Sequence, residues 1–146
     1  MLRTLLSATI ILITAVTLSS NAGAQVSKIR STGCPNAPYP TTVGSPTVGQ
    51  GFGVIAAPAR TAAGRGFLVF GTGGANVVLP APPACMRGCK LECRPLIVLH
   101  QEAARFMIPN DRNLIGMRFC AQSGALEAVR PNGCIYLHGA LAIRIQ

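Results

Sequence analysis

The feature that most constrains this chain is the regular recurrence of glycine and proline. The 146 residues include 16 Gly and 11 Pro, and a Gly or Pro breaks the apolar pattern roughly every ten residues. No window shows a long helical period flanked by caps, whereas several short apolar segments alternate with a period of two. The sequence therefore predicts an all-β protein, an antiparallel β-sandwich of the jelly-roll-like or Greek key kind. Its apolar segments are 52–56, 66–70, 76–79, 91–99, 104–108, 114–121 and 135–145.

The last two of these segments indicate a hairpin. In the final segment the apolar side chains share one face: Ile135, Leu137, Leu141, Ile143 and Ile145. If the two segments pair as antiparallel neighbours with Cys120 opposite Cys134, Phe119 lies opposite Ile135 and both cysteines lie on the same face, as a crosslink requires. We therefore predict a Cys120–Cys134 disulfide across a hairpin whose connection contains residues 131–133.

The N-terminus has the pattern of a signal for export. Arg3 precedes an apolar run over 5–18, and Ala22-Gly23-Ala24 has the small-residue spacing that a signal peptidase cuts. We expect a signal peptide over 1–24, with a retained membrane anchor as the alternative. An extended Pro/Gly-rich lead-in over 25–50 then packs on a β-sandwich domain over 51–146. The product is expected to be secreted, periplasmic or extracellular, with no membrane span after signal removal.

Six cysteines follow the predicted signal peptide. In an exported chain an even number is first interpreted as disulfides that stabilise a small domain. With Cys120 and Cys134 paired, three pairings remain open for the other four: Cys34, Cys85, Cys89 and Cys93. A zinc or cluster site built from some of Cys85, Cys89, Cys93 and His100 is the alternative, but zinc sites usually need a second cysteine pair. No metal or other cofactor is therefore expected.

The net charge of +9 is carried mainly by single, scattered arginines. Nucleic-acid binding normally clusters basic residues and interleaves them with aromatic ones, so no nucleic-acid partner is expected. For an exported chain, an anionic cell-surface polymer or another exported protein is a partner candidate, but a generic basic surface without a specific partner is the commoner outcome, and the sequence does not identify a partner. The outward faces of the last two segments carry our candidate binding residues, which are Arg118, Tyr136, His138 and Arg144.

Signals of catalysis are sparse. No Ser lies in a Gly-x-Ser-x-Gly turn, and no catalytic residue is assigned. His138 is expected to be an exposed histidine, and the glycine-rich runs at 49–53 and 71–74 are expected to be turns between strands. A small secreted hydrolase stays open as an alternative, with His138 or His100 as the base and Asp111 or Glu102 assisting.

A series of motifs over residues 32–146 resembles an uncharacterised exported bacterial β-sandwich module. The motifs are Thr32-Gly33-Cys34-Pro35, residues 44–49 with Phe52, residues 88–91, and the run Ile108-Pro109-Asn110-Asp111 followed by Leu114-Ile115-Gly116, Phe119 and Gln122, before a final apolar strand. The module occurs in planctomycete-type and myxobacterial secreted proteins, often as the last domain of a longer chain.

The resemblance implies a disulfide between Cys34 and Cys89 and no established activity. Together with Cys120–Cys134, it leaves Cys85–Cys93 by subtraction. The chain departs from the module by its four further cysteines, and by a His138-Gly139-Ala140-Leu141 segment where a Ser-Asn-x-Leu type is usual. The sequence favours a non-catalytic interaction or structural module at the cell exterior. A secreted hydrolase and a basic effector or inhibitor acting on anionic surface polymers are the alternatives.

Overall fold

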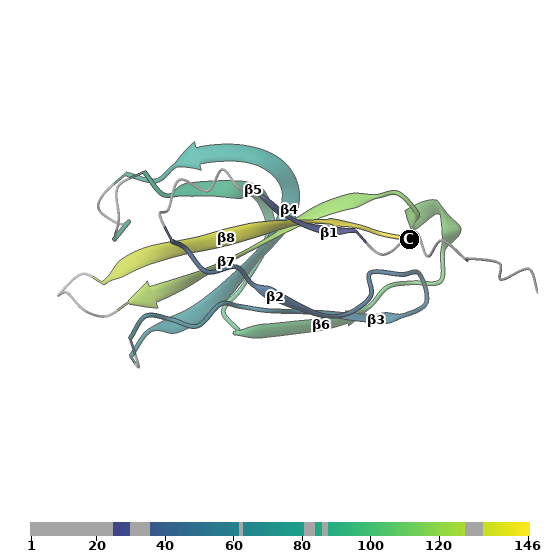
Figure 1. Ribbon diagram of the computed structural model, residues 1–146, viewed down its shortest axis with the longest axis horizontal. Helices are drawn as coiled ribbons and strands as arrows, with labels where there is room; N and C mark the ends of the chain where they lie inside the picture. The colour runs from purple at the N-terminus through teal and green to yellow at the C-terminus, as the bar shows by residue number, and fades with distance from the viewer. Residues whose placement is uncertain (1–24, 30–35, 62, 81–83, 86–87, 128–132) are drawn as a thin grey trace, which may run out of the picture.

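The structure is a computed structural model that describes residues 25–29, 36–61, 63–80, 84–85, 88–127 and 133–146. It confirms an all-β, antiparallel protein in which two sheets face each other (Figure 1). One sheet has the strand order β1-β8-β7-β4-β5, and the other has the order β2-β3-β6. The elements are β1 (Val26–Ile29), β2 (Thr41–Gly44), β3 (Gly51–Ile55), β4 (Arg65–Val78), β5 (Lys90–Leu99), β6 (Ala103–Met107), the 3₁₀ turn η1 (Arg112–Leu114), β7 (Arg118–Glu127) and β8 (Cys134–Arg144).

The segment predicted as a lead-in contributes a strand to each sheet. β1 pairs with β8 at the edge of the five-stranded sheet, and β2 pairs with β3 in the three-stranded sheet. The predicted signal peptide, 1–24, lies outside the described residues. No helix in the described part of the chain is long and apolar enough to cross a membrane.

The main core lies between the two sheets. Its buried side chains include Phe52 and Val54 from the three-stranded sheet and Leu68, Leu141 and Ile143 from the five-stranded sheet. Four aromatic rings extend this core in edge-to-face contacts with centroids 5.6–6.3 Å apart: Phe52, Phe70, Phe106 and Phe119. The alternating apolar residues that predicted strands therefore do bury one face of each sheet.

A second core forms because the five-stranded sheet folds over its own outer face. The far part of the β4–β5 hairpin, residues 72–78 and 90–93, is called here the β4–β5 arm. In Figure 1 the arm curls above β7 and β8. It covers buried side chains that face away from the main core, among them Val69, Leu137 and Ala140. The outer face of this sheet is therefore a second interior along part of its length.

The bend that forms the arm lies at Gly71, inside β4. The register between β4 and β5 shifts between Phe70 and Gly71, and a Cβ on Gly71 would collide with the backbone carbonyl of Arg94. Only glycine allows that approach. The prediction of turns at the glycine-rich runs is thus right only for residues 49–50, which turn between β2 and β3; residues 51–53 lie inside β3 and residues 71–74 inside β4.

The predicted hairpin of the last two segments is present as β7 and β8, but in another register. Cys120 lies opposite Ala142, and Glu127 lies opposite Cys134. Strand β7 continues to Glu127, the partner of Cys134, so Cys120 and Cys134 are separated by seven residues of strand, roughly 23 Å. The predicted Cys120–Cys134 disulfide is therefore wrong.

A bulge explains why the apolar face of β8 gave a misleading register. The pairing shifts between Gln122 and Gly124, and an extra residue in one strand moves the following side chains to the other face. As a result, Leu137 belongs to the second core and Leu141 to the main core. The five apolar residues expected on one face of β8 are divided between two cores.

The described disulfides are Cys85–Cys134 and Cys93–Cys120, with Cα atoms 5.1 Å and 5.4 Å apart. The predicted Cys85–Cys93 bond is therefore wrong as well. Cys89 is disulfide-bonded, but its predicted partner Cys34 lies outside the described residues. These crosslinks fit an oxidising compartment.

Candidate anion-binding site

Two of the candidate binding residues lie side by side. Arg118 on β7 and Arg144 on β8 are direct cross-strand partners, and both side chains are exposed. Their side chains share a face with Cys120, two residues along β7, and therefore point away from the main core. Together with Gln25, Ser27, Ala142 and Ile143 they line a pocket of about 250 Å³.

The pair has no compensating carboxylate among the described residues. Asp111 accepts a hydrogen bond from the backbone N–H of Asn113, and Glu127 is held by the loop at residues 60–61. Glu92 is buried at the β4–β5 arm, and the Cγ atom of Glu102 lies beside Gly66. Like charges placed directly opposite on adjacent strands repel each other. The pocket thus holds two cations that an anion would neutralise.

The chemistry of the pocket suits an oxyanion. A guanidinium group presents a planar fork of N–H donors that matches carboxylate, phosphate or sulfate oxygens. The hydroxyl of Ser27 and the side-chain amide of Gln25 are further donors at the same pocket. The lining therefore offers several donors that can bind an oxyanion.

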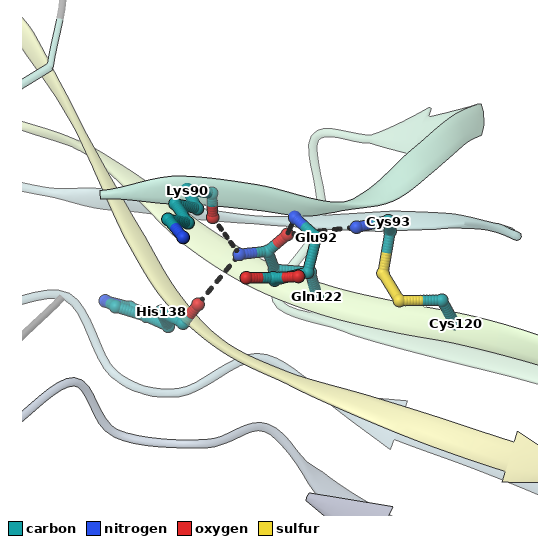
Figure 2. Close-up of a disulfide and its surroundings, with 6 residues drawn as sticks. All are labelled: Lys90, Glu92, Cys93, Cys120, Gln122 and His138. Carbon is teal, nitrogen blue, oxygen red and sulfur yellow. Dashed lines mark hydrogen bonds between the residues drawn. A yellow bond between two sulfur atoms is a disulfide. The ribbon is translucent and has the colours of Figure 1, made fainter. Parts of the chain in front are cut away.

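The part of β7 that follows Arg118 is crosslinked and hydrogen-bonded to neighbouring strands. Figure 2 shows Cys120 joined to Cys93 across the sheet, and next to it the buried side chain of Gln122. The Gln122 amide nitrogen donates to the carbonyl oxygens of Lys90 and His138, each at 3.0 Å, and its oxygen accepts from the Glu92 N–H at 2.9 Å. One side chain therefore ties the β4–β5 arm to both β7 and β8.

His138 and Tyr136 do not belong to this site. His138 was expected to be exposed, but it is only 2% exposed, because the bulge in β8 turns its side chain inward. Its Nδ1 atom lies 3.2 Å from the Ser123 hydroxyl, and its buried Nε2 atom has no hydrogen-bond partner among the described residues. The ring of Tyr136 lies 5.2 Å from the Arg60 guanidinium. The four candidate binding residues are therefore divided between two places.

The buried polar groups around His138 serve the fold. Ser123 accepts the backbone N–H of Ala57, and Glu127 accepts the N–H of Arg60 at 2.8 Å and the hydroxyl of Thr61 at 2.5 Å. Ser123 and Glu127 on β7 thus fasten the loop that leads into β4. Because both are fully buried, a substrate could not reach the Ser123 hydroxyl without local unfolding.

Burial and charge shift two pKa values in this region. Burial lowers the pKa of the His138 imidazole, the nearby Arg60 guanidinium lowers it further, and the Glu127 carboxylate acts in the opposite direction. The hydrogen bond from the Thr61 hydroxyl is the main cause that lowers the pKa of Glu127. The backbone donors and the Arg60 guanidinium lower it further, and together these effects outweigh burial, which raises it. A neutral His138 beside an ionised Glu127 is the resulting state at neutral pH.

The described residues do not form either of the two alternative sites, a hydrolase site or a zinc site. No interaction joins His138 to Asp111 or Glu102 among the described residues, and the histidine contacts Ser123 instead. The sulfur atoms of Cys85 and Cys93 are in separate disulfides, so they are not thiolate ligands. In the residues that the structure covers, no three His, Cys, Asp or Glu side chains are grouped to hold a metal.

Two features of this region were not predicted from the sequence: the role of Gln122 in joining strands and the contribution of β1 to the pocket. A polar Gln within the apolar run of β7 is the signal that could have identified the first. The second depends on the pairing of β1 with β8, a contact between residues more than a hundred positions apart.

The fold and the pocket together define a small, disulfide-crosslinked β-sandwich protein with an arginine pair on an open part of one sheet. Comparisons with protein-family models, with curated proteins and with solved structures found no match to this chain.

Proposed function

We propose that this protein is a secreted, non-catalytic binding module that holds anionic groups of a surface polymer outside the cell. The observation that carries the proposal is the direct opposition of Arg118 and Arg144 without a carboxylate from the described part of the chain. A repulsive pair on a well-ordered sheet is retained at a cost in stability. An anion bound beside both guanidinium groups removes their repulsion, and this relief adds to the free energy of binding.

Export is supported by three independent features. The N-terminal 24 residues have the pattern of a signal peptide, the described cysteines form disulfides, and the motifs over 32–146 resemble an exported bacterial module. Disulfides persist in oxidising compartments such as the periplasm or the extracellular space. An anionic polymer at the cell surface is then a partner that the protein would meet.

The experiment is a binding titration with a defined polyanion. Purified protein is titrated with heparin, dextran sulfate and polygalacturonate by calorimetry, and the double variant Arg118→Gln/Arg144→Gln is compared with Arg65→Gln/Arg112→Gln. Both double variants lose the same charge, and all four arginines are exposed. We expect the first to weaken binding to at least one polymer more than tenfold, and the second to weaken it less than threefold.

The outcomes separate the alternatives. Equal losses for the two double variants would mean that the general positive charge attracts polyanions, as expected of a basic effector, and would refute a site at the arginine pair. The appearance of new chain ends in any polymer after incubation would identify a hydrolase and refute a purely binding role. Absence of binding to all three polymers would also contradict the proposal.

A further inference from the structure

The outer face of the three-stranded sheet is hollowed where side chains are missing. β3 is the central strand of this sheet, and its inward side chains, Phe52 and Val54, belong to the main core. Because side chains alternate, Gly51 and Gly53 face outward. They lie in a groove of about 440 Å³ whose lining includes Val43 of β2.

The two outward glycines have different surroundings. A Cβ on Gly53 would lie 3.2 Å from the Cγ atom of Arg105 and 3.8 Å from the Cβ atom of Val43, so the stem of Arg105 covers this part of the strand. A Cβ on Gly51 would have no heavy atom within 4 Å. The backbone is therefore uncovered at Gly51, and the side chain of Arg105 bounds the groove on the side of Gly53.

The walls of the groove are apolar although they face outward. Met107 is 68% exposed and Val43 is 44% exposed, and both line the groove. The exposed face of an antiparallel sheet is normally polar. Apolar side chains gathered around a hollow mark a binding surface, and the volume falls within the range of about 300–1,000 Å³ of small-molecule sites.

The charge and the hydrogen bonding of the groove restrict what it can hold. Arg105 supplies a guanidinium group at the lining, and it forms no ion pair with a carboxylate of the described residues. β3 is paired on both sides, with β2 and with β6, so its backbone cannot accept a peptide as an added strand. The occupant therefore needs an apolar body for the walls and an anionic group for Arg105.

We propose that this groove binds a single-chain carboxylate of the fatty-acid type. The alkyl chain lies over Gly51 between Val43 and Met107, and the carboxylate pairs with Arg105. The site is on the opposite sheet from the Arg118–Arg144 pocket, and the proposal does not depend on polymer binding.

The test uses decanoate below its critical micelle concentration, with calorimetry as the readout. Arg105→Gln removes the charge, and Gly51→Leu fills the groove where a side chain meets no neighbour. The matched controls are Arg65→Gln and Gly73→Leu, because a Cβ on Gly73 is also free of contacts. We expect one decanoate per protein, a loss of at least tenfold with Arg105→Gln, no measurable binding with Gly51→Leu, and less than a twofold change in the controls.

Charge selectivity and folding complete the test. Decyltrimethylammonium has the same chain length with a positive head, and it should bind at least tenfold more weakly than decanoate. Equal binding of the two amphiphiles, undiminished decanoate binding by Gly51→Leu, or no decanoate binding by the unmodified protein would each overturn the proposal. The exposed Arg105→Gln variant does not perturb the core, so the test stands even if Gly51→Leu fails to fold.

Discussion

Cys93 and Cys120 are joined by a disulfide although their strands are not neighbours. β4 lies between β5 and β7 in the sheet, and strands two positions apart in a flat sheet are separated by roughly 10 Å. The Cα atoms of the two cysteines are 5.4 Å apart, within the range that a disulfide can bridge. The sheet must therefore fold over at β4, and the bond fixes the arm that results.

The bend should not tolerate a side chain at Gly71. In the Gly71→Ala variant the added Cβ meets the carbonyl of Arg94, and we expect a loss of about 1–3 kcal/mol in the free energy of unfolding. Gly73→Ala, two residues further along, adds a Cβ to open space and should change stability by less than about 0.5 kcal/mol. Urea unfolding of both variants tests this, and equal stabilities would show that the bend does not require glycine.

Removing the crosslink should loosen the arm selectively. The Cys93→Ser/Cys120→Ser variant is expected to lose about 2–4 kcal/mol, and hydrogen exchange should speed up in residues 72–78 and 90–93. The matched variant Cys85→Ser/Cys134→Ser removes a bond at the start of β8 instead. Its arm should keep the exchange protection of the unmodified protein. Faster exchange of the arm in both variants would contradict a local role for Cys93–Cys120.

Gln122 should contribute as much to the free energy of unfolding as a large apolar core residue. Gln122→Met keeps the approximate shape but leaves the Glu92 N–H and the carbonyls of Lys90 and His138 without their partner. Leaving buried backbone groups unsatisfied should cost about 2–4 kcal/mol. The same substitution at the exposed Gln50 should have an effect below about 0.5 kcal/mol. Chemical denaturation measures both, and a stable Gln122→Met protein would show that water replaces the amide.

The sequence predicted the class of fold correctly and the register between β7 and β8 incorrectly. Alternating apolar residues identified β7 and β8 as neighbouring antiparallel strands, because each face of a strand is set locally. The register was eight residues out, since Cys120 pairs with Ala142 instead of Cys134. The alternation of apolar residues along one strand does not show where a bulge occurs. It also does not show that the β4–β5 arm covers the outer face of the sheet.

The same limit explains what could be predicted of the site. Arg118 and Arg144 were candidates because both lie on the outward face of their strands, which needs only alternation. His138 has the same parity as Arg144, but the bulge between them places it in the interior. A residue's exposure on β8 depends on which side of the bulge it lies, and that depends on tertiary pairing.

Burial of His138 should make stability depend on pH. The pKa of this imidazole is lower in the folded state than its ordinary value of 6.5, so the unfolded chain binds more protons as the pH falls below 6.5. Stability should therefore be complete above this value and decrease as the pH falls toward the folded-state pKa. His138→Gln should remove this slope, whereas His100→Gln, at an exposed position, should keep it. Unfolding at several pH values tests this, and a slope unchanged by His138→Gln would contradict it.

Glu127 should act at lower pH and with its own control. Its pKa lies below the ordinary value of 4.5, so its contribution is present above pH 4.5 and is lost as the pH falls through the folded-state pKa. Glu127→Gln should flatten this acid limb, and because the Glu127 carboxylate raises the pKa of His138, the substitution should also lower the pKa of His138 further and extend the His138 slope to lower pH. Unfolding of the unmodified protein, His138→Gln and Glu127→Gln at several pH values measures each slope, and an acid limb that is unchanged in Glu127→Gln would contradict this assignment.

The arginine pair should leave a signature in stability even without a ligand. Replacing Arg118 by Gln removes the repulsion from Arg144 across the strands, so the variant should be more stable by about 0.5 kcal/mol at low ionic strength. Because both groups are exposed, salt should screen the repulsion and erase the gain near 1 M, where the Debye length is about 3 Å. Arg65→Gln, which lies opposite Leu126, should show no such salt-dependent gain. Adding a polyanion should reverse the order, raising the melting temperature of the unmodified protein above that of Arg118→Gln, because binding to the folded state alone stabilises it. If Arg118→Gln is the less stable protein at low salt, the two guanidinium groups do not repel each other in the folded state, and the physical basis of the proposed site is lost.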